Sequence, residues 1–172
     1  MTTSSPEVPT IRNRAFLSHA TADKQFVHQV AHRLGKQRVV VDDQEFITGE
    51  AFMETIRRGL SASQLFVLFA SKASLSSLWV KFEINEAEEL LRSEILASSS
   101  VFIIDQETSH RDLPRWMQRA LVSRNTRPTS VARAIEYQLN QLPSVGQRRL
   151  FLGRNEEVQR ITDLRLFSRI RG

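Results

Sequence analysis

Short apolar segments alternate with longer amphipathic segments along this chain, and this alternation restricts the possible folds more than any other feature. We predict strands at residues 14–18, 38–42, 64–70 and 100–105, with a shorter fifth strand at 119–122. We predict helices at 23–34, 50–60, 78–96 and 130–142, where apolar residues recur at three- and four-residue spacing. Alternating strands and helices are typical of a parallel sheet with helices on both faces. We therefore expect an α/β, flavodoxin-like three-layer sandwich whose five-stranded parallel sheet has the order 2-1-3-4-5.

Two residues should mark helix ends. Gly35 should end the first helix, because glycine readily adopts the backbone conformation that follows a helix. Ser130 should be the N-cap of the last helix, since a serine hydroxyl accepts a hydrogen bond from a free N–H of the first turn.

Length and composition exclude several protein classes. The chain has 172 residues, 41% of them hydrophobic, which suits one folded domain better than a disordered chain or a coiled coil. Its longest apolar run, 65–70, is far shorter than the roughly 20 residues of a membrane-spanning helix, and its start lacks the features of a signal peptide. The absence of cysteine excludes disulfides, thiolate metal sites and cysteine nucleophiles. We expect a cytoplasmic protein that does not enter a membrane.

The net charge of +5 is concentrated at one end of the chain. Residues 143–172 contain seven arginines against three acidic residues, so the preceding domain is nearly neutral. A domain without a basic stripe does not predict nucleic acid as a partner. We assign residues 1–11 to a flexible leader, 12–142 to the α/β domain, and 143–172 to a linker followed by the start of a further region.

Common catalytic and metal-binding motifs are missing. The sequence has no phosphate-binding loop, no GxGxxG, no GxSxG and no HExxH. His28 and His32 have a spacing that could bind a metal, but no third ligand is arranged with them, so we expect a solvated helix face and no metal. A phospho-receiver domain is disfavoured, because the acidic pair Asp42 and Asp43 follows the second strand and not the first.

Three stretches resemble TIR domains: FLSHATAD at 16–23, VVVDDQEFITGEAF at 39–52 and LFVLFASKASLSSLWVKFE at 65–83. The third is the most specific, because Trp79 and Glu83 match the family's W-x-x-x-E arrangement. Some TIR domains cleave NAD+ with a glutamate at this place, and others are non-enzymatic adaptors. The resemblance implies an NAD+ glycohydrolase with Glu83 as the catalytic residue, NAD+ as substrate and no cofactor. The alternative is a TIR interaction module without catalysis.

A carboxylate suits this reaction. Cleavage of the nicotinamide–ribose bond passes through an oxocarbenium-like state, which a fixed carboxylate stabilises. The side chains that should form the buried stripe of the helix at 78–96 are those of Val80, Ile84, Ala87, Leu91 and Ile95. We therefore expect Glu83 at an exposed position off this stripe, next to the crevice at the carboxyl ends of the first and third strands. The competing interpretation is a solvated residue on an acidic helix.

The resemblance implies further substrate contacts. Ser18 and His19 begin the loop after the first strand, where the family contacts substrate. Trp79 either anchors the core or stacks against nicotinamide.

The segment 42–49 corresponds to the family's loop that covers the site and contacts a neighbouring protomer. Asp43 either binds the ribose or begins the turn, and Phe46 or Phe52 supplies the loop's apolar contact.

The tail carries a second resemblance. RRLFLGRNEEVQRITDL, at 148–164, is similar to the segment that precedes the phosphate-binding loop in STAND ATPases, the signal-transduction ATPases with numerous domains. This implies a truncated TIR–ATPase protein, homotypic TIR–TIR association, and activation by oligomerisation in bacterial immune defence.

Overall fold

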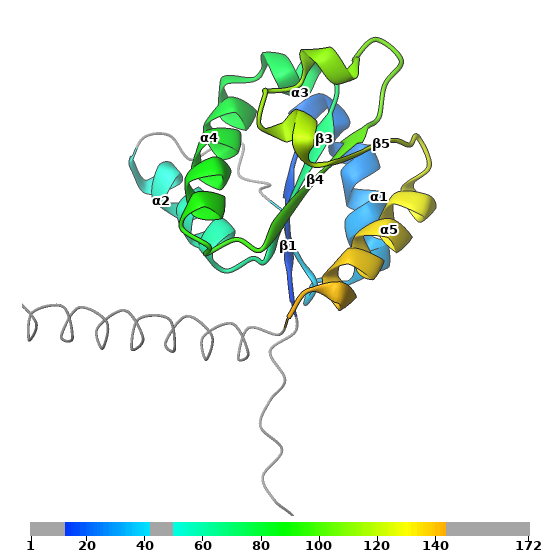
Figure 1. Cartoon of the computed structure of the whole chain (residues 1–172). Coiled ribbons are helices and arrows are strands. Elements are labelled where there is room, and N and C mark those ends of the chain that lie inside the picture. The colour runs from blue at the N-terminus through cyan, green and yellow to red at the C-terminus, as the bar shows by residue number, and fades with distance from the viewer. Residues whose placement is uncertain (1–12, 42–49, 144–172) are drawn as a thin grey trace, which may run out of the picture. The chain divides into compact units, whose positions relative to one another are not determined.

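A five-stranded parallel sheet forms the centre of the protein. The computed structural model describes residues 13–41 and 50–143. The strands are β1 (Ala15–Ser18), β2 (Val39–Val41), β3 (Leu65–Ala70), β4 (Ser98–Ile103) and β5 (Leu121–Arg124). Their order is β2-β1-β3-β4-β5, with every neighbouring pair parallel, which confirms the predicted topology (Figure 1). Residues Asn13–Leu142 form one compact unit.

Helices cover both faces of the sheet. They are α1 (Lys24–Leu34), α2 (Glu50–Ser61), α3 (Lys72–Ser76), α4 (Leu78–Arg92) and α5 (Pro128–Gln141), with short 3₁₀ turns η1 (Thr21–Asp23), η2 (His110–Asp112) and η3 (Met117–Arg119). α1 packs beside α5 on one face, and α2 packs beside α4 on the other (Figure 1). None of the described helices is long and apolar enough to cross a membrane.

Strand β3 connects the two halves of the core. All six of its side chains are buried. Successive strand residues point to opposite faces, so Phe66 and Leu68 pack on the α2–α4 side while Val67 and Phe69 pack on the α1–α5 side. Burying each such side chain stabilises the fold by roughly 1.5–3 kcal/mol. An apolar strand buried on both faces is typical of a sheet between two helix layers.

Two predicted helix boundaries were wrong. The helix predicted at 78–96 ends at Arg92, because Glu94 takes a left-handed backbone conformation with φ of 58°. Ile95, predicted to be buried, is therefore 45% exposed. The last helix begins at Pro128 and not after Ser130, since the fixed φ of proline suits the first helical position, where its missing N–H costs nothing.

Two glycines have clear roles. Gly35 follows α1 with φ of 86°, which confirms it as the residue that ends this helix. Gly59 lets α2 approach the sheet, because a Cβ there would lie 3.0 Å from the Phe16 ring and 3.2 Å from the Val40 side chain.

Candidate functional site

Glu83 lies on the buried face of α4 and not on the exposed face that we expected. Its side chain is 1% exposed, and it shares this face with Val80, Ile84 and Ala87. Position 83 is three residues after Val80 and four before Ala87, so helical geometry places it on their stripe. The spacing already contained this information, so the expectation that Glu83 lies off the stripe was wrong.

Ser18 supplies a polar partner for this buried carboxylate. It is the last residue of β1 and is completely buried. Its hydroxyl donates a hydrogen bond to Oε2 of Glu83. A buried carboxylate is costly unless it is hydrogen-bonded, so this contact makes the polar position tolerable in the core. The pair joins the carboxyl end of β1 to the second turn of α4.

The other predicted site residues differ in placement. His19 is half-buried, with Nδ1 3.3 Å from the carbonyl oxygen of Leu17. Trp79 is 38% exposed in the first turn of α4, so it is not a core anchor. Asp43 and Phe46 lie outside the described residues, as does the side chain of Phe52. Of the residues predicted for substrate contact, the structure joins Ser18 directly to Glu83.

A second side-chain pair lies at the same edge of the sheet and was missed from sequence. The Ser71 hydroxyl donates a 2.6 Å hydrogen bond to Oδ2 of Asp23. Burial raises the pKa of Asp23 and the nearby Asp105 carboxylate adds to this, whereas the Ser71 hydrogen bond and the charge of His19 act in the opposite direction. Both residues belong to stretches that resembled the TIR family, and this was the available signal.

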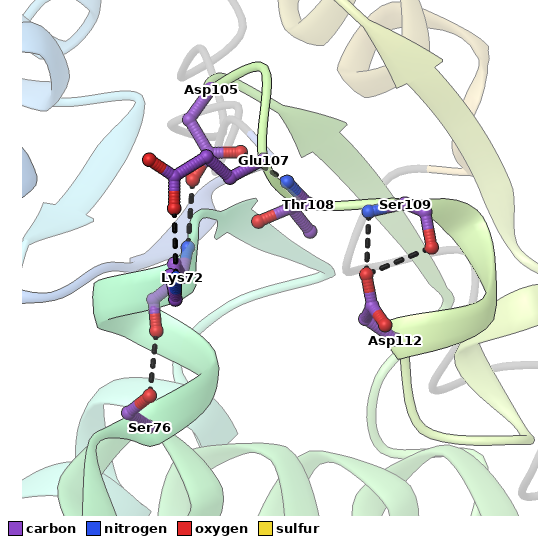
Figure 2. Close-up of polar contacts among 7 residues, drawn as sticks. All are labelled: Lys72, Ser76, Asp105, Glu107, Thr108, Ser109 and Asp112. Carbon is purple, nitrogen blue, oxygen red and sulfur yellow. Dashed lines mark hydrogen bonds and ion pairs between the residues drawn. The ribbon is translucent and has the colours of Figure 1, made fainter.

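Asp105, just after β4, also reaches this edge. Its two carboxylate oxygens accept 2.8 Å hydrogen bonds from the backbone N–H groups of Lys72 and Thr108 (Figure 2). Burial alone would raise the pKa of Asp105, but these backbone donors and the nearby Arg124 outweigh it and hold the pKa below its ordinary value. An exposed 3.0 Å ion pair joins the Lys72 ammonium to Glu107 (Figure 2).

These contacts converge at the carboxyl ends of β1, β3 and β4, where doubly wound sheets bind ligands. The Glu83 carboxylate could hold ribose hydroxyls or stabilise positive charge, with Ser18 fixing its orientation. The described residues contain no cluster suited to hold a metal ion. A surface groove of about 580 Å³ lies elsewhere, against α1 and β2, and the exposed side chains of His28 and His32 line it.

Comparisons with known proteins agree with this architecture. The sequence profile of the TIR domain matches residues 15–133. The fold is similar to that of a metazoan TIR-STING receptor from C. gigas, with a TM-score of 0.53 and 19% sequence identity. That match covers 82% of this chain and 45% of the receptor chain, so this chain spans less than half of the receptor. The search of curated proteins found no match. Because the profile spans most of the sheet and its helices, the chain belongs to the TIR domain family.

Proposed function

We propose that this protein is an NAD+ glycohydrolase that cleaves the nicotinamide–ribose bond and releases nicotinamide and ADP-ribose, linear or cyclised. The observation that carries the proposal is the Ser18–Glu83 hydrogen bond. It fixes a carboxylate at the edge of the sheet where this fold class binds ligands, and that carboxylate stands in the family's W-x-x-x-E arrangement.

The reaction requires few other groups from the protein. When the bond breaks, its electron pair leaves with nicotinamide, a neutral base that needs no protonation. The ribose is left as an oxocarbenium-like cation, which the Glu83 carboxylate stabilises. For hydrolysis, water adds to the same carbon and releases its proton. Ser18 orients Glu83 before substrate arrives, so that less reorganisation is needed in the transition state.

Burial of the pair favours control of this activity by assembly. Ser18 and Glu83 are both almost fully buried, so substrate must gain access before the carboxylate can act. We propose that homotypic TIR association opens or completes the site, with Asp43 and Phe46 contributed from the segment 42–49. A downstream STAND-type ATPase would drive this association in bacterial immune defence.

A second candidate is a TIR interaction module without catalysis. The same burial favours it, because a carboxylate fully enclosed by its own domain can be purely structural. The two candidates differ in whether clustered protein consumes NAD+.

The test measures nicotinamide release from NAD+ by protein clustered on a multivalent support. Glu83→Gln should lower the rate by at least about a hundredfold, because it removes the stabilising charge and keeps the side-chain shape. Ser18→Ala should lower it less. Glu86→Gln is the matched control, since Glu86 lies on the same helix and pairs with Arg57 at 2.9 Å on the surface.

Two results would decide against the proposal. If clustered parent protein releases no nicotinamide above the buffer rate, the interaction module is the better function. If Glu83→Gln is as active as Glu86→Gln, the carboxylate is not the catalytic group.

A further inference from the structure

The start of α3 is held from two sides by carboxylates that belong to different strand–helix connections. Asp23, from the connection after β1, accepts the Ser71 hydroxyl at 2.6 Å. Asp105, from the connection after β4, accepts the backbone N–H of Lys72 at 2.8 Å (Figure 2). Ser71 and Lys72 are consecutive residues, so both carboxylates bind the same short segment of the chain.

Ser71 uses its hydroxyl twice at this point. While it donates to Asp23, the same oxygen accepts the Ser74 N–H at 3.0 Å, and the Ser74 hydroxyl accepts the Ser71 N–H at 2.8 Å. This capping box satisfies N–H groups at the start of α3 that would otherwise lack partners. The hydrogen bond to Asp23 therefore fixes the direction in which the Ser71 hydroxyl points.

Only one residue separates α3 from α4. Ser77 is the C-cap of α3, with its N–H bonded to the Ala73 carbonyl at 3.1 Å, and it is also the N-cap of α4, with its hydroxyl accepting the Val80 N–H at 3.4 Å. Because a single residue joins the two helices, a displacement of α3 shifts the first turns of α4 unless the backbone angles of Ser77 change. Those turns contain Trp79 and Glu83.

We infer that Asp23 and Asp105 are positioning residues, which hold α3 and so set the place of α4's first turns, including Glu83. The catalytic part of this inference rests on the proposed NAD+ cleavage. Neither carboxylate needs to touch substrate. Ser18 holds Glu83 directly from β1, whereas Asp23 and Asp105 hold the backbone that carries it.

The experiment combines amide hydrogen exchange with steady-state kinetics on the full chain. Asp23→Ala should speed exchange at the Ser74 and Val80 amides by about tenfold, the effect of losing one hydrogen bond, while β3 amides keep the parent rates. On clustered protein it should lower kcat by about tenfold or more, with KM within about twofold, because the bound substrate meets a misplaced carboxylate.

Matched variants separate positioning from general damage. Asp23→Asn retains an oxygen that accepts the Ser71 hydroxyl, so it should recover most of the exchange protection and of kcat. Asp105→Ala removes the acceptor of both backbone N–H groups, including that of Lys72, and should act like Asp23→Ala. Glu107→Gln is the control, because Glu107 pairs only with the exposed Lys72 ammonium among the contacts described, and it should match the parent.

The inference would be overturned if the Ser74 amide of Asp23→Ala exchanged at the parent rate. It would also be overturned if the Ser74 amide exchanged as fast in Asp23→Asn as in Asp23→Ala. If the exchange pattern is as expected but even the parent releases no nicotinamide, the positioning of α4 stands and the proposed function fails. If the parent is active and Asp23→Ala keeps the parent kcat despite faster exchange, Asp23 does not position Glu83 for catalysis, while the proposed function stands.

Discussion

Replacing Ser18 and Glu83 by alanine, singly and together, should reveal a coupling free energy of about 1–3 kcal/mol in the stability of the fold. The two side chains are 0% and 1% exposed, so water does not replace the lost partner easily. Hydrogen bonds contribute about 0.5–1.5 kcal/mol when neutral and about 1.5–3 kcal/mol when one group is charged. These ranges set the expected coupling.

The single variant Glu83→Ala should lower the free energy of unfolding by about 2–4 kcal/mol, because it adds a cavity to the lost hydrogen bond. An exposed helical glutamate would have cost less than about 0.5 kcal/mol. Activity lost in Glu83→Ala would therefore be mixed with lost stability, and this is why Glu83→Gln is the better test of catalysis.

Urea unfolding monitored by circular dichroism, at fixed pH and salt, measures the four free energies, and equal denaturant slopes would justify comparing them. The control cycle uses Arg57 and Glu86, which pair at the surface and should couple by about 0–1 kcal/mol. A Ser18–Glu83 coupling below about 0.5 kcal/mol, or one no larger than the control, would refute the energetic importance of the buried contact.

Four further outcomes are expected. Nicotinamide release per molecule should rise as protein is concentrated or clustered, because association is proposed to complete the site; constant specific activity would contradict this. Gly59→Ala should destabilise the fold by about 1–2 kcal/mol in urea unfolding, since the new Cβ would press on the buried Phe16 ring at 3.0 Å; a more stable variant would show that the ring moves aside. Deleting residues 144–172 should change the melting temperature by less than about 5 °C, because the compact unit ends at Leu142; a larger drop would place the tail in the core. The pKa of Asp105 is lower in the folded protein than in the unfolded chain, so its ionised carboxylate should stabilise the fold at pH values above its ordinary pKa. This stabilisation should be lost as the pH falls through the lowered pKa of the folded protein. Asp105→Asn should therefore flatten this part of the acid unfolding curve.

The sequence by itself determined the sheet and its order. Apolar runs such as 64–70 identify strands, amphipathic periodicity identifies helices, and their alternation leaves few closed arrangements. Gly35 was identified as a helix end because glycine adopts the positive φ that follows a helix without help from residues distant in the sequence. The TIR family was recognisable from the first three strand–helix units, where chemistry-bearing residues stand at fixed spacing along the chain.

Tertiary structure alone decided which polar residues meet. Ser18 and Glu83 are 65 residues apart, and Asp23 and Ser71 are 48 apart. Helical spacing put position 83 on a buried stripe, and the Ser18 hydroxyl at the end of β1 helps to make a carboxylate tolerable there. Asp105 accepts backbone N–H groups, which no side-chain pattern indicates. Periodicity describes how residues three or four apart share a helix face, whereas the partner of a buried charge depends on which strands lie side by side in the folded sheet.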